Sequence, residues 1–171
     1  MTLFSASSAS DDERPLELLY ACHERVRRFT STAGRLAVHV RAHGADAEAR
    51  EAASNVLRYF DLALPNHHAD EEEDVFPALR RLGDAAVDQA IDDLLAQHET
   101  LGAAWGEVRP WLAGIAAGET PAGEPAVLPA FVADYAAHAE LEERAVFSAL
   151  SRLPDDVIDD IAQRMRARRG G

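Results

Sequence analysis

The chain has 171 residues, 47% of them hydrophobic, and a formal net charge of −13 at pH 7. This length supports one domain with a buried core, and the negative charge argues against nucleic-acid binding as a main role, because phosphate would be repelled. The single cysteine, Cys22, excludes an intramolecular disulfide and a cysteine-based zinc site. Because no signal-peptide pattern and no run of about 20 apolar residues is present, we expect a cytoplasmic protein without a membrane span.

Residues 1–13 are rich in serine and aspartate, and we expect them to form a disordered N-terminal tail. A first helix is predicted to begin at Pro15. Its apolar side recurs at alternating steps of three and four, at Leu16, Leu19, His23, Val26, Thr30, Ala33, Ala37 and Val40. This helix should end at Gly44. A second helix is predicted from about 46 to 82, with a kink at Pro65.

The third predicted helix shows the same alternation, at Ile91, Leu94, His98, Leu101, Trp105, Val108, Leu112 and Ile115. The sequence GETPAGEP, residues 118–125, indicates a loop. A fourth helix is expected over 126–152, and Pro154 should end it. These elements predict an all-α fold, an antiparallel up-down four-helix bundle over residues 14–153. A short fifth helix, within 154–171, should pack on the bundle.

One phrase occurs twice in the chain, as HHADEEEDVFPAL at 67–79 and as HAELEERAVFSAL at 138–150. Aligning the two copies places His67 on His138 and Glu71 on Glu142. In a helix, residues four apart differ by about 40° in direction and lie one above the other. Each pair therefore presents an imidazole and a carboxylate on one face of its helix, and two such faces can meet in a bundle.

Two further histidines, His23 and His98, replace an apolar residue in otherwise regular core patterns. A buried imidazole needs polar partners. One such histidine is usually a structural residue, but one on each long helix is hard to explain by packing alone. Carboxylates can bridge two cations and imidazoles can cap them, and iron is the natural ion for mixed nitrogen and oxygen ligands. We therefore predict a two-metal centre formed by His23, His67, Glu71, His98, His138 and Glu142.

The second helix leaves two ligand registers open, His67 with Glu71 or His68 with Glu72. The repeat favours the first register, because the fourth helix has an alanine directly after its histidine. In the fourth helix, Glu143 is an alternative to the glutamate before it.

The remaining polar residues near these motifs have simpler interpretations. Asp70, Glu73 and Asp74 are interpreted as a solvated face of the second helix. The closing arginines, in RMRARR, are expected to balance the acids and complement a helix C-terminus. Tyr20 and Tyr135 each precede a predicted ligand by three residues. They could hydrogen-bond a ligand, although core packing is the simpler explanation.

At these positions the chain resembles the hemerythrin-like family, the HHE cation-binding domain, in its bacterial single-domain type. The motifs that carry the resemblance follow in the family's order, as ACHERVRR, LPNHHADEEEDVFPAL, LLAQHETL and YAAHAELEERAVFSAL. The resemblance implies a four-helix bundle holding a non-haem di-iron centre, with the six residues named above as ligands. The third helix departs from the oxygen-carrying hemerythrins, which have two histidines four apart there, because Gly102 stands at that spacing after His98. This departure argues against a simple oxygen carrier and leaves His68 or a tyrosine oxygen as a further donor.

We therefore expect a di-iron protein that senses or handles oxygen, nitric oxide, peroxide or iron itself. The alternative is an enzyme that uses the same centre, acting on peroxide or in nitric-oxide-linked repair. The expected partner is a small diatomic molecule or peroxide. We expect no binding to nucleic acid or to a membrane. The chain is expected to be a monomer or a homodimer, and zinc or manganese can replace iron in a recombinant sample.

Overall fold

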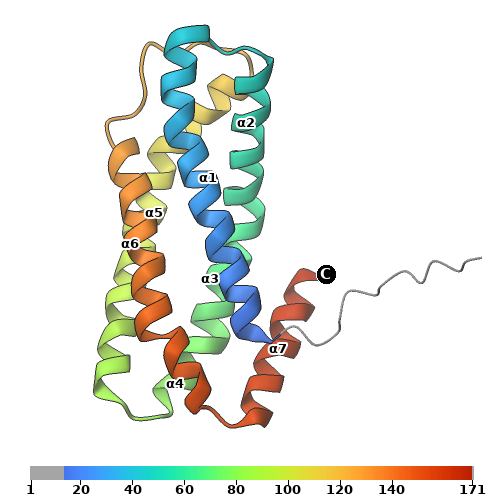
Figure 1. The fold of residues 1–171 in the computed structure, drawn as a ribbon, viewed down its shortest axis with the longest axis vertical. Coiled ribbons are helices and arrows are strands. Elements are labelled where there is room, and N and C mark those ends of the chain that lie inside the picture. Colours follow the sequence, from blue (N-terminus) through green and yellow to red (C-terminus); the bar gives the residue numbers. More distant parts are fainter. Residues whose placement is uncertain (1–13, 171) are drawn as a thin grey trace, which may run out of the picture.

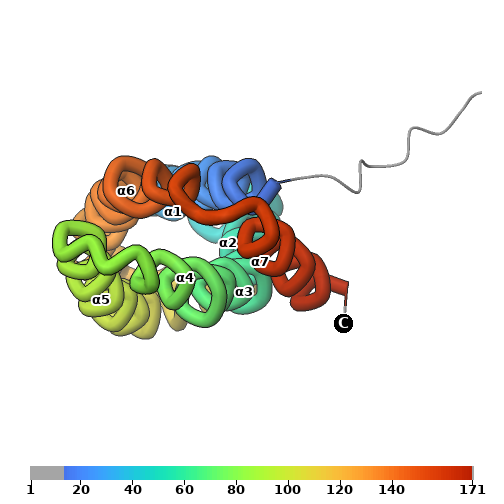
Figure 2. The backbone as a smooth tube through the Cα atoms, turned by 90° about the horizontal axis from the view of Figure 1, so that it is seen from below, coloured from blue at the N-terminus to red at the C-terminus, as the bar shows by residue number. Residues whose placement is uncertain are grey.

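The computed structural model describes residues 14–170, and every regular element in that range is a helix. The prediction of an all-α fold is therefore confirmed for this part of the chain, while the predicted tail, residues 1–13, lies outside it. The long helical segments lie side by side along the molecule (Figure 1). Seen from one end, they surround a common axis (Figure 2).

The helix bounds follow in chain order. The first segment is α1 (Pro15–His43), and the second is made of α2 (Ala47–Arg58), η1 (Tyr59–Ala63), α3 (Leu64–Ala69), η2 (Asp70–Val75) and α4 (Phe76–Arg80). The third segment is α5 (Ala85–Ala116), and the fourth is α6 (Leu128–Ala145) followed by the 3-10 helix η3 (Phe147–Arg152). A last helix, α7 (Asp155–Arg169), follows Pro154.

Helix ends follow the chemistry that the sequence predicts. At the end of α1, Gly44 has a φ of 71° and its N–H donates to the carbonyl of Val40. Asp46 then caps α2, since its side chain accepts a hydrogen bond from the N–H of Ala49. The predicted fourth helix, in contrast, is not continuous. After Ala145 the chain tightens into η3, a 3-10 helix.

The second segment contains two π-helical turns, η1 and η2, and each ends directly before a proline-containing turn. At the end of η1 the N–H of Leu64 donates to the carbonyl of Tyr59, five residues back, directly before Pro65. The end of η2 repeats this pattern before Pro77. A proline lacks an N–H and its ring crowds the carbonyl four residues back, and a π-helical turn accommodates such a disruption. The sequence predicted a kink at Pro65, where the structure has a π-helical turn, and it did not predict the turn before Pro77.

The four long segments contact one another in a closed ring. Helix α1 packs against α2 and α6, and α5 packs against the same two helices. Successive segments run in opposite directions (Figure 1). Helix α7 lies beside one end of this assembly, where it contacts η2 and α1 (Figure 2). Within residues 14–170, no helix combines the length and the apolar character that crossing a membrane requires.

Two apolar clusters fill the interior. The first includes Val26 and Leu101, and the second includes Leu19 and Leu94. On α1 and on α5, the boundary between the clusters therefore falls on the turn that carries a histidine. A polar layer separates the two halves of the core.

Candidate metal centre

Six buried polar side chains lie in the layer between the apolar clusters. They come from all four long segments, as His23 on α1, His67 on α3, Glu71 on η2, His98 on α5, and His138 and Glu142 on α6. None of them is more than 8% exposed, and both glutamates are fully buried. The structure thus brings together all six residues that the sequence predicted as ligands. Their role in binding metal stays a prediction.

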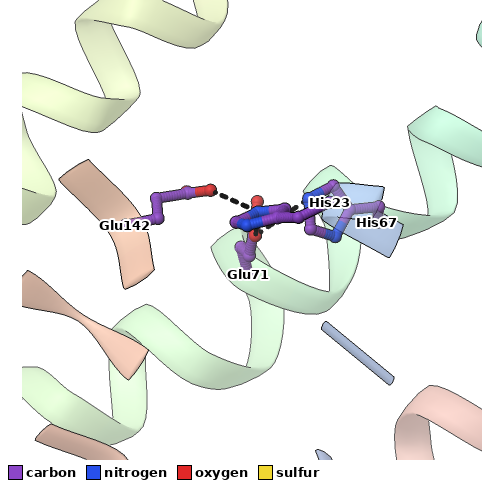
Figure 3. A group of neighbouring side chains, drawn as sticks. All are labelled: His23, His67, Glu71 and Glu142. Carbon is purple, nitrogen blue, oxygen red and sulfur yellow. Dashed lines mark hydrogen bonds and ion pairs between the residues drawn. The ribbon is translucent and has the colours of Figure 1, made fainter. Parts of the chain in front are cut away.

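The first donor group consists of His23, His67, Glu71 and Glu142, which each offer one ligand atom within 4.8 Å of the others. Figure 3 shows these four side chains pointing toward one another. The Nε2 atom of His67 lies 3.1 Å from Oε1 of Glu71, one helical turn away. Across the bundle, Nε2 of His23 lies 3.0 Å from Oε2 of Glu142. Three of the four long segments therefore contribute to this group.

The second donor group consists of His98, His138 and Glu142. The Nε2 atoms of the two histidines are 3.1 Å apart, and Nε2 of His138 is 3.4 Å from Oε2 of Glu142. Glu142 therefore belongs to both groups. Glu71 also extends toward the second group, with its Oε2 atom 3.6 Å from Nε2 of His98. Because a carboxylate has two oxygens, each glutamate can face two cations.

The outward-facing nitrogens of three histidines are held by polar side chains that lie outside both donor groups. The Nδ1 atoms of His23, His98 and His138 lie 2.9, 2.6 and 2.9 Å from side-chain oxygens of Glu143, Glu72 and Gln97, respectively. An oxygen acceptor at this position requires the proton on Nδ1 and leaves the Nε2 lone pair directed into the layer. The two alternative ligands, Glu72 and Glu143, thus hold histidine rings from outside. The contact of Gln97 with His138 was not predicted, because it crosses from α5 to α6.

Several buried atoms of this layer lack the partners they need. No hydrogen bond within residues 14–170 reaches Nδ1 of His67, either carboxylate oxygen of Glu71, or Oε1 of Glu142. The Nε2 atoms of His98 and His138 face each other although the Nδ1 atoms of both rings point to acceptors. An unsatisfied buried polar atom costs about 1–3 kcal/mol, and facing lone pairs repel. Cations would accept the lone pairs of these carboxylate oxygens and of the two facing Nε2 atoms, so the donor set fits a metal centre.

Burial shifts the pKa values in this layer toward the neutral forms. Burial, with the neighbouring Glu142 as a second cause, raises the pKa of Glu71 well above its ordinary value. Burial lowers the pKa of His98 to about 4 and, together with nearby histidines, lowers that of His138 to about 2. The imidazoles of His98 and His138 are therefore held neutral, which is the form that binds a metal.

The sequence pattern of the hemerythrin HHE cation-binding domain matches residues 14–150. The chain belongs to the hemerythrin HHE cation-binding domain family. It is also 31% identical over 155 residues to an uncharacterized protein of Haemophilus influenzae, a match that covers 91% of this chain and 90% of that protein. The region that matches the family, residues 14–150, contains both donor groups, whereas α7 lies beyond it.

In this hemerythrin-like centre, α5 contributes one histidine. Leu94 and Gly102 stand four residues before and after His98, and Leu94 is a buried core residue. The half-buried ring of His68 stacks on that of His98, with the ring centroids 4.1 Å apart. His68 belongs to neither donor group. His68 therefore lies beside the predicted ligands and contacts one of them, His98, through its ring.

Ordinary packing accounts for the two tyrosines that precede predicted ligands. Tyr20 is 42% exposed and packs edge-on against Phe147. Tyr135 is buried and packs edge-on against Phe60 and Phe131.

The interpretation of Asp70, Glu73 and Asp74 as a solvated face is wrong for two of the three. Asp70 is 0% exposed and Asp74 is 5% exposed, whereas the side chain of Glu73 is 67% exposed. Arg168, on α7, donates to Oδ1 of Asp70 at 2.5 Å and to Oδ2 of Asp74 at 2.9 Å. A helix pattern cannot reveal this burial, because the covering arginine lies 98 residues after Asp70.

We expect the metal-free protein to lose stability as the pH falls from about 6.5 toward about 4.5. Burial lowers the pKa of His67 well below its ordinary value of 6.5, and it lowers the pKa values of His68, His98 and His138 to about 3, 4 and 2. In this window these histidines are protonated only when the chain unfolds. A pKa lowered by folding contributes stability that is present above the ordinary pKa and is lost below it.

Two glutamates act in the opposite direction in the same pH window. Burial raises the pKa values of Glu71 and Glu142 above their ordinary value of 4.5, so these carboxyls take up protons at a higher pH in the folded state than in the unfolded chain. Because four histidines act against two glutamates, the unfolded chain binds about two more protons than the folded chain. The free energy of unfolding therefore falls by up to about 3 kcal/mol for each pH unit of acidification. Urea unfolding of metal-free protein at pH 7, 6 and 5 measures the loss. Constant or rising stability on acidification would contradict these pKa directions.

A comparison of two neighbouring alanine variants separates the two ligand registers. His67→Ala should remove most of the bound metal, because Nε2 of His67 lies in the first donor group. His68→Ala should leave most of the metal in place, since this ring only stacks on His98. Elemental analysis of the two purified variants makes the comparison, with circular dichroism as a check of helix content. The reverse pattern would place the ligands one residue later, with Glu72 in place of Glu71.

Proposed function

We propose that this protein binds two non-haem iron ions, one at each donor group, on an antiparallel up-down four-helix bundle. The observation that carries the proposal is the position of Glu142, whose carboxylate belongs to both groups. Glu71 is placed similarly, with Oε1 3.1 Å from Nε2 of His67 and Oε2 3.6 Å from Nε2 of His98. Two carboxylates that face both groups can bridge two cations and offset part of their charge.

The chemistry of the donors favours iron. The two groups together offer four imidazoles and two carboxylates, while the free buried Cys22 belongs to neither. Imidazole suits iron, zinc, copper and nickel, carboxylate suits harder ions such as manganese, and thiolate would favour softer ones. Iron combines well with both donor types present. Zinc and manganese are the competing ions in a recombinant host.

The two groups differ in how many donors the chain supplies, four in the first and three in the second. A metal with fewer protein donors keeps a position for water or a small external molecule. We propose that this position serves oxygen, nitric oxide or peroxide, which the protein senses or handles. Bound iron would supply the one-electron and oxygen chemistry. The apolar clusters on both sides of the layer would exclude bulk water from it.

Metal content tests the first part of this proposal. Metal-free protein that is loaded with Fe(II) under anaerobic conditions and then desalted should retain about two iron atoms per chain, since both donor groups accept a mixed nitrogen and oxygen ion. Elemental analysis gives the number. A chain that retains no transition metal after this treatment would contradict the proposal.

Reactivity of the iron-loaded protein tests the second part. A visible-absorption change that saturates with oxygen, nitric oxide or peroxide, and reverses when the ligand is removed, is the result expected of a binding protein. Steady consumption of peroxide, or turnover that depends on nitric oxide, would instead support the enzymatic alternative. Glu142→Gln is the negative control, because it alters the residue that both groups share and should therefore lose the metal and the response.

A further inference from the structure

The side chain directly before Glu71 is an aspartate without contact to solvent. Asp70 is 0% exposed, and burial of an ionised carboxylate costs several kcal/mol unless it is paired. The last turn of α7 supplies the pairing. Arg168 donates from Nη1 to Oδ1 at 2.5 Å, and Arg169 donates from Nη2 to Oδ2. Both oxygens of Asp70 are therefore held by a helix that lies beyond the family match.

Arg168 also binds the other end of the same π-helical turn. Its guanidinium donates to Asp74 and to Glu73, at 2.9 Å in each case. A π-helical turn is rare and is found mostly as a single turn inside an α-helix, often at functional sites. A guanidinium bound at residues 70 and 74 fixes η2 at both ends. Glu71 lies between these points, so the direction of its carboxylate depends on them.

Arg169 reaches α1, which carries the predicted ligand His23. Its Nη2 atom lies 3.9 Å from Sγ of Cys22, the residue directly before His23. The same side chain donates to the carbonyl of Met165 in its own helix, which holds its position. The two arginines thus connect η2 with α1, the elements that carry Glu71 and His23. Both of these predicted ligands belong to the first donor group.

We propose that Arg168 and Arg169 form an arginine clamp that positions Glu71 and His23 and so slows the release of metal from the first donor group. The inference rests on the proposed function, since it assumes that the group binds a metal. Both arginines are positioning residues, because neither belongs to a donor group.

Helix α7 has a separate attachment to the bundle. Ile161 and Met165 are 3% and 0% exposed and lie in the second apolar cluster with Leu19 and Phe76. Neutralising the arginines therefore leaves the apolar face of α7 in place. Metal release can then be measured on a chain that still folds.

The test compares Arg168→Gln/Arg169→Gln with wild type and with Arg166→Gln, a change at an exposed arginine of the same helix. Each protein is loaded with Co(II), whose visible bands report the arrangement of its ligands, and is then mixed with excess EDTA. We expect the double variant to release cobalt about 10- to 100-fold faster, because the loss of a supporting partner of a ligand typically weakens metal affinity by about that factor. Its visible bands should shift, while Arg166→Gln should behave as wild type.

Two further variants complete the experiment. Arg168→Lys/Arg169→Lys keeps the charge but loses the paired donors of the guanidinium, so its release rate should fall between wild type and the glutamine variant. If the double glutamine variant loses the circular-dichroism spectrum of wild type, Arg169→Gln alone gives the same comparison with a smaller expected change.

The outcomes separate the clamp from the proposed function. Unchanged release and unchanged visible bands in the glutamine variant would contradict the clamp, even with a lower melting temperature, because the arginines would then only stabilise the fold. Wild-type protein that binds neither cobalt nor iron would contradict the proposed function, and the clamp with it.

Discussion

Glu142→Gln should remove most of the metal from both donor groups at once. This glutamate is the residue that the two groups share, and an amide of the same size carries no charge and offers one acceptor oxygen. Loss of a group that merely supports a ligand weakens metal binding about 10- to 100-fold, so the loss of a shared ligand should weaken it at least about 100-fold. Elemental analysis after Fe(II) loading and desalting measures the effect.

The matched control is Glu140→Gln, an exposed position two residues earlier on α6 that should bind metal as wild type does. Metal-free Glu142→Gln should also melt no lower than metal-free wild type. Burial is the largest cause of the raised pKa of Glu71, and the nearby carboxylate of Glu142 is the second. The substitution removes this second cause. Full metal content in Glu142→Gln would show that neither group depends on this residue.

Metal binding should raise the melting temperature by about 8–16 °C, with little change in helix content. A ligand that binds only the folded state adds about 4 kcal/mol at a free concentration 1,000 times its Kd. A chain of this length gains about 2–4 °C for each kcal/mol. In metal-free protein the layer carries unpartnered oxygens on Glu71 and Glu142, and metal binding removes the cost of burying them. Thermal unfolding followed by circular dichroism, with and without iron, measures the shift.

His98→Leu is the informative variant for this stabilisation. His98 lies between the core residues Leu94 and Leu101 on α5, so leucine extends the apolar side of that helix. The metal-free variant should melt no lower than metal-free wild type, yet it should gain less from iron because one donor of the second group is gone. A gain equal to that of wild type would make His98 a structural residue.

Local spacing was enough to predict which side chains meet in the layer. A histidine and a glutamate four residues apart point the same way on any helix, so the repeated pairs of His67 with Glu71 and of His138 with Glu142 could be read directly. The single histidines were visible because each interrupts an apolar pattern. The choice of His67 over His68 followed from comparing the two copies, and the structure places His67 in a donor group and His68 outside both.

Contacts between distant segments could not be read in this way. Gln97 and His138 lie on different helices, and no spacing rule connects them. Asp70 is buried against two arginines at the end of α7. In the sequence alone, this aspartate cannot be distinguished from any other acid on a charged helix face. The π-helical turn before Pro77 was missed because the prediction considered only Pro65 as a source of distortion in the second helix.

Anomalous diffraction from crystals of the iron-loaded protein, collected at the iron absorption edge, tests the central claim most directly. Two peaks are predicted, one among His23, His67 and Glu71 and the other beside His98 and His138, with the carboxylate of Glu142 contacting both. Crystals that show no iron peak within this layer, or that show iron only on the surface, would contradict the assignment of these residues as a metal centre.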